Sequence, residues 1–308
     1  MSDCAFLFPG QGAQVLGMGR DLAEAYPEAR NLLERAETHL RVPLGKIMFD
    51  GPEERLNEDF SAQVAVYTVS CMVTEVLAAR GLRAAAMAPY SSGLYAAAYA
   101  AGSLGFEAGL TLMREADSCI RGHNGSGAMG VVLGLSADQV AELCTQVPGE
   151  VEVSIINTHH QIIVSGQPSS VTALLEKAAA AGALKTSLLP ASAPYHCSLL
   201  ADADQCLSER VARTPLAAPH TPIISYIDAQ SLRSSPAMAK MLSIQLSNPV
   251  HWVKVVEDLV CRGLMPMVEI GPGQMLGRCV RWIHRRAVVL HTETAAALEA
   301  AIESVSRC

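Results

Sequence analysis

The sequence Pro89-Tyr90-Ser91-Ser92-Gly93 lies between an apolar run, residues 84–88, and an alanine-rich segment, residues 94–101. This order predicts a strand, a sharp turn and a helix, with Ser91 at the turn. A turn of this kind with a serine at its tip is called a nucleophile elbow. It exposes the serine hydroxyl beside the free N–H groups of a helix N-terminus. The usual elbow is G-x-S-x-G, and Pro89 takes the place of its first glycine. A serine that merely caps the helix has the same pattern, so the motif alone leaves both interpretations open.

Composition limits the classes of protein to which the chain can belong. Half of the 308 residues are hydrophobic and 17% are charged, which is typical of a globular protein with a large core. The net charge of -7 argues against a nucleic-acid partner, because phosphate binding needs a basic surface. No charge-free window is long enough to span a bilayer, and the N-terminal residues 1–4 lack the basic segment of a signal peptide. We therefore expect no membrane partner.

Cysteine usage indicates the redox compartment. The chain has nine cysteines without a C-x-x-C pair. Most of them lie in apolar segments, as reduced core thiols do, for example Cys71, Cys144 and Cys261. We therefore expect a cytoplasmic protein.

The two ends of the chain predict the larger part of the fold. A short apolar strand at residues 5–8 ends at the turn sequence Pro9-Gly10-Gln11-Gly12. Helical periodicity covers residues 21–40, 62–79 and 107–121, and further strands are expected at 223–226 and 267–270. We predict an α/β fold, with an α/β-hydrolase-like core and a parallel sheet, built from residues 1–124 and 197–308.

The middle of the chain has a different pattern. Strands are expected at residues 127–134, 151–156, 161–165 and 185–189, with helices at 136–146 and 169–181. The order β-α-β-β-α-β is that of the ferredoxin-like split unit. Residues 125–196 are therefore predicted to form a ferredoxin-like α+β subdomain inserted into the core.

Four motifs, one of them the Ser91 elbow, occur in a fixed order along the chain. They are F-P-G-Q-G-A-Q at 8–14, the elbow, P-Y-H-C at 194–197, and N-P-V-H-W at 248–252 before G-P-G at 271–273. Together with the inserted unit, they resemble the malonyl-CoA:acyl-carrier-protein transacylase family over nearly the whole chain. The resemblance implies an acyltransferase of fatty acid or polyketide biosynthesis, which works through an acyl-serine intermediate. It implies acyl-CoA and phosphopantetheine as substrates, an acyl carrier protein as partner, and no bound cofactor or metal.

The resemblance also assigns catalytic roles. Ser91 falls on the nucleophile, His196 on the general base, and Asn248 on the residue whose main-chain carbonyl orients that histidine. The backbone N–H groups of Gln11 and Ser92 fall on the oxyanion hole. A serine hydroxyl is a poor nucleophile until a base accepts its proton, and two aimed donors stabilise the tetrahedral oxygen. Without the family context, a structural core histidine would be the simpler interpretation of His196.

The chain departs from the family on the substrate side. Tyr90 replaces a family histidine, Leu94 replaces a glutamate, and Ala116 stands where the family has the arginine that pairs with the malonyl carboxylate. Helical spacing places Ala116 on an inward apolar stripe and Arg114 and Arg121 on the other side. Because a buried unpaired carboxylate costs several kcal/mol, we expect a neutral acyl group to be preferred over malonyl. The alternative is that an arginine from another part of the chain pairs with the malonyl carboxylate in place of the missing one.

Further polar and basic residues complete the expected site. Asn157 and Gln161 match polar family positions near the active site, and Tyr90, Leu94 and Ala116 join them as expected substrate contacts. A turn role explains Asn157 equally well. Arg278, Arg281 and Arg285 share one helix face and are expected to dock an acidic carrier protein, with a solvated helix face as the alternative. His159 and His160 are adjacent, so their side chains diverge and no metal site is expected.

Two other functions remain open. Relatives without the arginine include acyl hydrolases that clear carrier proteins, in which water replaces the thiol. The other alternative is a non-catalytic homologue that binds a carrier protein. The combination of Ser91, His196 and Gln11 argues against an active site that has lost its catalytic function.

Overall fold

A six-stranded, mostly parallel sheet forms the centre of the molecule. The computed structural model describes residues 4–122 and 127–306. The strand order is β10-β9-β1-β2-β7-β8, and every pairing is parallel except β7 with β8 at the edge. The strands are β1 (Ala5–Phe8), β2 (Ala86–Pro89), β7 (Ile223–Ile224), β8 (Ser231–Leu232), β9 (Met267–Glu269) and β10 (Val289–His291). β1 and β2 are fully buried, as expected of parallel strands covered on both faces.

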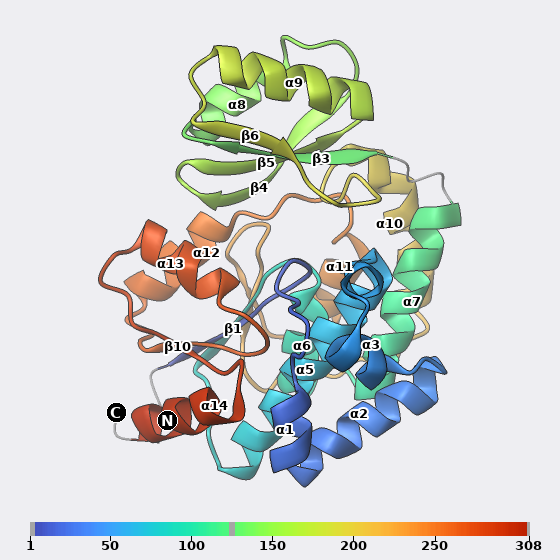
Figure 1. The fold of residues 1–308 in the computed structure, drawn as a ribbon, viewed down its shortest axis with the longest axis vertical. Coiled ribbons are helices and arrows are strands. Elements are labelled where there is room, and N and C mark those ends of the chain that lie inside the picture. The colour runs from blue at the N-terminus through green and yellow to red at the C-terminus, as the bar shows by residue number, and fades with distance from the viewer. Residues whose placement is uncertain (1–3, 123–126, 307–308) are drawn as a thin grey trace.

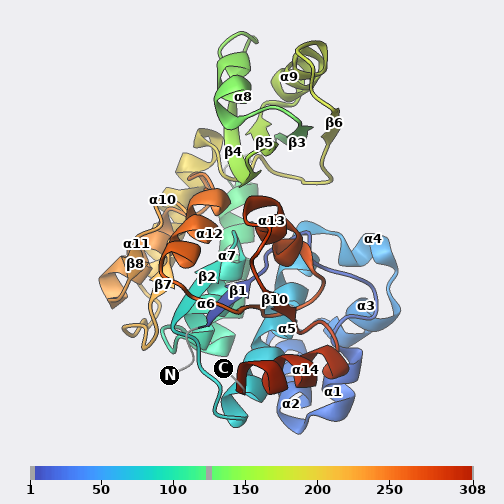
Figure 2. The same ribbon diagram turned by 90° about the vertical axis from the view of Figure 1, so that its left-hand side faces the viewer.

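Helices surround this sheet (Figures 1 and 2). They are α1 (Arg20–Ala25), α2 (Pro27–Leu40), α3 (Leu44–Asp50), α4 (Glu53–Leu56), α5 (Asp59–Ala79), α6 (Gly93–Ala100), α7 (Phe106–Gly122), α10 (Ala201–Val211), α11 (Ser235–Ser243), α12 (Trp252–Cys261), α13 (Met275–Ile283) and α14 (Ala295–Ser306). A short 3-10 turn, Ser198–Leu200, precedes α10. The predicted helix over 21–40 is two helices, because Pro27 at the first position of α2 starts a new one.

The long helix α5 is the central core helix. Among the described helices it alone is long and apolar enough to cross a membrane by length and composition, and 72% of that window is buried inside the protein. Its buried side chains include Tyr67 and Met72. Burial on nearly all sides explains why this helix is apolar around its whole circumference.

A second, antiparallel sheet lies at one end of the molecule, at the top of Figure 1. Its strand order is β4-β5-β3-β6, from β3 (Ala128–Leu133), β4 (Val151–Thr158), β5 (Gln161–Gly166) and β6 (Lys185–Leu188). Helices α8 (Ala137–Cys144) and α9 (Pro168–Ala180) cover one face, and the sheet has an apolar cluster of its own, which includes Val132, Ile162 and Leu174. The predicted α/β class is confirmed, with a parallel-rich sheet and a separate antiparallel one. The division into 1–124 with 197–308 and 125–196 stays a prediction, and its boundary between residues 124 and 125 lies outside the described residues.

One cysteine prediction differs from the structure. Cys71, Cys144 and Cys261 are free, although Cys261 is exposed, but Cys119 of α7 forms a disulfide with Cys206 of α10. The two residues are 87 positions apart, so no local spacing indicates the pair. The prediction of reduced core thiols is therefore wrong for Cys119 and Cys206, which are oxidised, and for Cys261, which is free but outside the core. The cytoplasmic location stays a prediction.

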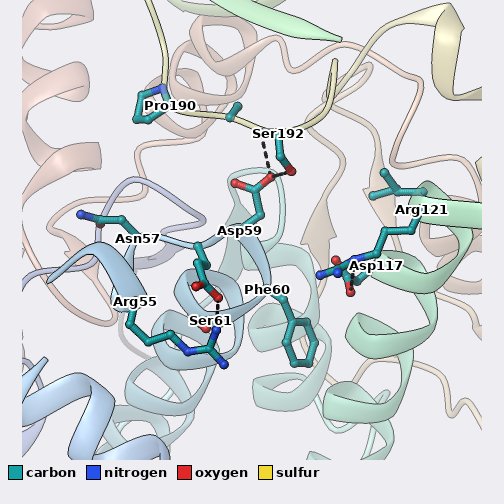
Figure 3. A pocket seen from close by; sticks show the side chains of 12 residues that line it. Arg55, Asn57, Asp59, Phe60, Ser61, Asp117, Arg121, Pro190 and Ser192 are labelled. Atoms are coloured by element: carbon teal, nitrogen blue, oxygen red, sulfur yellow. Dashed lines mark hydrogen bonds and ion pairs between the residues drawn. The ribbon is translucent and has the colours of Figure 1, made fainter. Parts of the chain in front are cut away.

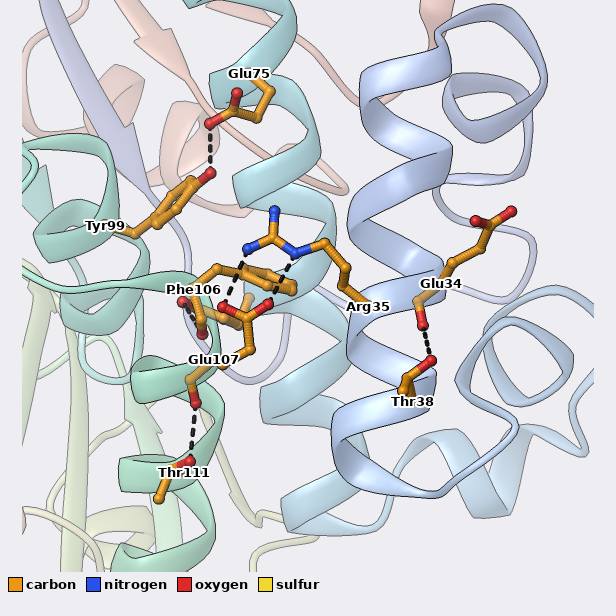
Figure 4. A network of polar contacts seen from close by, with 9 residues as sticks. Glu34, Arg35, Thr38, Glu75, Tyr99, Phe106, Glu107 and Thr111 are labelled. Atoms are coloured by element: carbon orange, nitrogen blue, oxygen red, sulfur yellow. Dashed lines mark hydrogen bonds and ion pairs between the residues drawn. The ribbon is translucent and has the colours of Figure 1, made fainter.

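A polar network holds α7 against its neighbours (Figure 4). Arg35 of α2 donates to both carboxylate oxygens of Glu107 at 2.8 and 3.0 Å, and its guanidinium lies 5.2 Å from the centre of the Phe106 ring. Tyr99 of α6 donates to Glu75 of α5 beside this pair. These contacts join α2, α5 and α6 around α7, which carries Ala116.

Candidate active site

The elbow predicted at Ser91 is present. β2 ends at Pro89 and α6 begins at Gly93, and Ser91 between them has a φ of 51°. That left-handed conformation is uncommon for a residue with a side chain and is typical of a strained strand-to-helix elbow. A Cβ at Gly93 would lie 2.1 Å from the carbonyl oxygen of Phe8, so only glycine permits this close approach of α6 to β1.

Ser91, His196 and Asn248 form one hydrogen-bonded chain. Ser91 Oγ lies 2.7 Å from His196 Nε2, and His196 Nδ1 lies 2.9 Å from the main-chain oxygen of Asn248. A carbonyl only accepts, so the proton of the neutral ring is on Nδ1 and Nε2 accepts from the serine hydroxyl. The arrangement leaves the imidazole ready to take a proton from Ser91.

The supports of His196 come from the loop before α12. The His196 backbone N–H donates to Leu246 O at 2.6 Å, and the buried carboxylate of Asp204 accepts from the backbone N–H groups of Leu246 and Ser247. Asn248 Nδ2 donates to Ile244 O at 2.8 Å. His196 itself has a φ of 66°, a strained conformation that this framework maintains.

Burial changes the basicity of His196. Loss of hydration lowers the pKa of His196 to about 4, and the interactions of its ring with the backbones of Asn248 and Gln245 oppose the shift. Desolvation disfavours the charged imidazolium. His196 is therefore neutral, and able to accept a proton, throughout the physiological pH range.

The turn after β1 lies beside the elbow. β1 and β2 are neighbours in register, with Phe8 opposite Pro89, so the segments that follow them meet at the same edge of the sheet. Gln11 N donates to Ser92 Oγ at 3.2 Å. A Cβ at Gly10 would lie 2.6 Å from Tyr90 O, which explains the glycine at that position.

Two cavities meet at Ser91 and His196. The larger, of about 250 Å³, lies between the two sheets and is mainly apolar, with Met129, Ile155 and Ile163 from the second sheet. The smaller, of about 20 Å³, extends toward α7 and is lined by Tyr95, Ala116 and Asp117. None of the described residues that line either cavity is an arginine or a lysine.

The family assignment rests on two kinds of comparison. A model of the acyl transferase domain matches residues 5–296. The chain belongs to this family. The malonyl CoA-acyl carrier protein transacylase of Bacillus subtilis (strain 168) is 31% identical over 99% of this chain and 98% of its own length. The enzyme of the same name from Escherichia coli (strain K12) is 32% identical over 90% of this chain and 91% of its own.

Solved structures agree with this assignment. The malonyl CoA-acyl carrier protein transacylase from Coxiella burnetii superposes with a TM-score of 0.94 at 29% identity, over 98% of this chain and 97% of that one. A malonyl-transacylase solved in complex with a type II PKS acyl-carrier protein has a TM-score of 0.94 at 30% identity, over 97% and 99% of the two chains. The predicted resemblance is confirmed, and with it the general activity of an acyltransferase.

The predicted substrate contacts of this acyl transferase divide into two groups. Tyr90 and Asn157 both line the larger cavity, and Tyr90 OH donates to Asn157 Oδ1 at 2.7 Å. Ala116 lines the smaller cavity, and its inward stripe on α7 is buried as expected. Leu94 is completely buried and Gln161 is half-buried at the start of β5, and neither lines a cavity at Ser91. Nothing in the described contacts supports a substrate role for these last two.

Sequence reasoning missed Asp59, at the first position of α5. Its Oδ1 accepts from Gln11 Nε2 at 2.6 Å, and its Oδ2 accepts from the backbone N–H of Ser192 at 3.0 Å and from Tyr195 OH at 3.1 Å. Gln63 donates to Gln11 Oε1 at 3.0 Å and lies 3.5 Å from Tyr195 OH. The carboxylate thus ties the turn at Gln11 to the residue before His196. Its partners are up to 136 positions away, so only its place at a helix start gives a local signal.

Asp59 also faces an open groove of about 910 Å³ (Figure 3). Arg121 and Arg55 line this groove, and each has an acidic partner, Asp117 at 3.0 Å for Arg121 and Glu58 for Arg55. Neither arginine lines the cavities at Ser91. Arg121 nevertheless lies close to the smaller cavity, because the groove and that cavity share Asp117 and Ile120 in their linings.

Arg278 and Arg281 lie on α13, but the helix ends at Ile283, so Arg285 follows it and the prediction that the three arginines share one helix face is wrong for Arg285. Arg278, Arg281 and Arg285 line an open pocket of about 270 Å³ with Trp282. No group of three His, Cys, Asp or Glu side chains in residues 4–122 and 127–306 could hold a metal ion.

Proposed function

We propose that this chain transfers an acyl group from a CoA thioester to the phosphopantetheine thiol of an acyl carrier protein through an ester on Ser91. Ser91 Oγ attacks the thioester carbon while His196 Nε2 takes the hydroxyl proton. The carbon–sulfur bond then breaks, and the proton passes to the departing thiolate. The observation that carries the proposal is the chain from Ser91 Oγ to His196 at 2.7 Å and on to the Asn248 carbonyl at 2.9 Å.

The backbone N–H groups of Gln11 and Ser92 are proposed to bind the tetrahedral oxyanion. The support is their adjacency at the carboxyl ends of β1 and β2, beside the N-terminus of α6. Gln11 N–H donates to the Ser92 hydroxyl, and in the reaction this bond is exchanged for one to the oxyanion. Asp59 is proposed to position Gln11 for that exchange.

The preferred acyl group is proposed to be neutral and short. Ala116 and Asp117 line the small cavity behind Ser91, and no cationic side chain among the described residues lines it. A malonyl carboxylate directed there would find no cationic side chain in the described lining, since the Arg121 guanidinium lies outside it and already pairs with Asp117 at 3.0 Å. A desolvated carboxylate without a counter-ion costs several kcal/mol. The cavity of about 20 Å³ favours a group as small as acetyl.

A carrier protein is the proposed acceptor, as the names of the related malonyl transacylases indicate for those enzymes. Arg278, Arg281 and Arg285 are proposed to attract its acidic surface. In the second half-reaction His196 takes the proton of the carrier thiol, whose sulfur attacks the ester carbon; the carbon–oxygen bond to Ser91 breaks and the proton passes to Ser91 Oγ. The proposal needs no metal or redox cofactor, because each proton and bond change is thus assigned to Ser91, His196 and the two thiols.

Intact-mass measurement after incubation with a panel of acyl-CoAs tests the proposal. We expect a covalent acetyl adduct on the wild-type chain that is absent from Ser91→Ala and is discharged by a holo carrier protein. An adduct that water discharges as fast as the carrier does would identify an acyl hydrolase. No adduct from any acyl-CoA or acyl-pantetheine would leave a non-catalytic carrier-binding protein.

A further inference from the structure

The pocket on α13 has an unusual combination of exposed side chains. Its described lining is Arg278, Arg281, Trp282 and Arg285, and Trp282 is 75% exposed. No ion pair joins any of these three arginines to a carboxylate in the described part of the chain. Arg281 Nη1 lies 3.5 Å from Nε2 of His291, whose other ring nitrogen lies 3.3 Å from the Glu269 carboxylate. An uncompensated cationic cluster in a chain of net charge -7 is suited to an anion.

This pocket is aligned with the cavity at Ser91. Met275, the first residue of α13, lines the larger cavity. Arg278 and Trp282 follow it at i+3 and i+7, so the three share one face of the helix. At 1.5 Å of rise per residue, Trp282 lies about 10 Å farther along that face than Met275. The helix thus leads from the proposed acyl-transfer site to the cationic pocket.

We propose that this pocket binds the nucleotide end of acyl-CoA, with the phosphates on the arginines and the adenine ring stacked on Trp282. Guanidinium groups bind phosphate oxygens in a planar, bidentate geometry. An exposed indole ring offers a stacking surface for a base. The pantetheine arm then runs past Met275 to Ser91. This assignment rests on the proposed function, since it places the donor of that same reaction.

The site also fits the proposed carrier role of the three arginines. In a reaction through an acyl-enzyme, CoA leaves before the carrier protein delivers its thiol, so both can use the pocket in turn. The carrier arm joins pantetheine to the protein through one phosphate, whereas CoA joins it through a diphosphate to adenosine 3′-phosphate, so the two share phosphate but only CoA has an adenine. Trp282 is therefore the residue that distinguishes the two, and it is expected to matter for CoA alone.

Binding can be measured without activity. The chain has two tryptophans, and Trp252 is fully buried, so a ligand that reaches the surface quenches Trp282. Adenosine 3′,5′-bisphosphate is the probe. We expect saturable quenching in the wild type, weakened about tenfold or more by Arg278→Ala and Arg285→Ala, and unchanged in Arg286→Ala, the exposed neighbour outside the pocket. No saturable quenching, or equal weakening by Arg286→Ala, overturns the proposal.

Kinetics then connect the pocket to the reaction. The measurement is the rate of Ser91 acylation from acetyl-CoA and from acetyl-pantetheine, which lacks the nucleotide. Trp282→Ala should lower kcat/KM for acetyl-CoA about tenfold and leave that for acetyl-pantetheine unchanged, with Trp282→Phe retaining most of the activity. Equal losses with both donors would overturn the assignment, and so would a loss confined to the carrier half-reaction. If acetyl-pantetheine acylates Ser91 at the wild-type rate while the predicted effects of Trp282→Ala are not seen, only the assignment of the pocket fails and the proposed function stands. If neither donor acylates Ser91, the proposed function fails first.

Discussion

Ser91 Oγ and His196 Nε2 lie 2.7 Å apart although the two residues are separated by 105 positions. Both residues have positive φ angles, an uncommon backbone conformation for residues with a side chain. The contact between the two side chains depends on these two conformations. It also depends on a carbonyl, not a carboxylate, as the partner of Nδ1. A neutral partner orients the imidazole without contributing a negative charge to the pair.

This relationship separates the roles of His196 and Asn248. His196→Ala should slow acylation of Ser91 about a thousandfold, since general-base catalysis contributes on the order of 10²–10⁴. Asn248→Ala keeps the main-chain oxygen that accepts from Nδ1 and loses the side-chain bonds to Ile244 O and Ser247 Oγ. We expect it to retain activity within about tenfold of wild type. Single-turnover acylation monitored by intact mass checks both variants. Comparable losses in the two would show that the side chain of Asn248 acts directly.

The pH dependence follows from the buried imidazole. Its pKa is lowered to about 4 by burial, so the neutral, basic form is lost only as the pH falls through that value. The rate of acylation should therefore stay level from pH 8 to about pH 5 and decline below it, with a midpoint near 4. Stopped-flow acylation in a series of constant-ionic-strength buffers gives the profile. A midpoint near 6.5, the ordinary value for histidine, would contradict the desolvated environment.

Selectivity for the acyl group should respond to one position on α7. Ala116→Arg introduces a guanidinium into the cavity behind Ser91 and should raise the ratio of malonyl to acetyl loading about a hundredfold, equivalent to about 3 kcal/mol. Ser118→Arg adds the same group to the exposed face of that helix and should leave the ratio unchanged. Competition between malonyl-CoA and acetyl-CoA, read by mass, gives the ratio directly. Faster malonyl loading by the wild-type chain would refute the proposed preference.

Asp59 should affect the reaction without touching the substrate. Asp59→Ala removes the acceptor shared by Gln11, Ser192 and Tyr195, and we expect the acylation rate to fall about tenfold as the oxyanion donor loses its support. Asp59→Asn keeps one acceptor oxygen and should recover part of the rate. Glu58→Ala alters the adjacent exposed residue, whose ion pair is with Arg55. If this control is as impaired as Asp59→Ala, the effect belongs to the start of α5 in general.

The elbow glycine should be critical for stability. Gly93→Ala places a Cβ 2.1 Å from Phe8 O, and the backbone shift needed to relieve that contact should cost about 3 kcal/mol or more of unfolding free energy. Gly105→Ala is the matched control, because its Cβ would meet nothing within 4 Å, and it should change stability by about 0.5 kcal/mol or less. Urea unfolding followed by circular dichroism measures both. Equal stabilities would mean that α6 shifts away from β1 at little cost.

The sequence by itself determined the elements and their order. The strand-turn-helix at Ser91 and the six elements of the inserted unit follow from local periodicity and turn residues, which act over a few positions. The inward stripe at Ala116 is likewise a property of one helix. The family resemblance added the pairing of Ser91 with His196, which no local pattern contains.

Only the tertiary structure decided which distant groups meet. The carboxylate of Asp59 joins Gln11 to Tyr195, and Cys119 pairs with Cys206. Leu94 packs into the core, outside the cavity expected around it. The volumes of the two cavities at Ser91, about 20 and 250 Å³, are likewise set by the tertiary structure. These features depend on the packing of elements far apart in the chain, and close packing is set by the shapes of all neighbours at once.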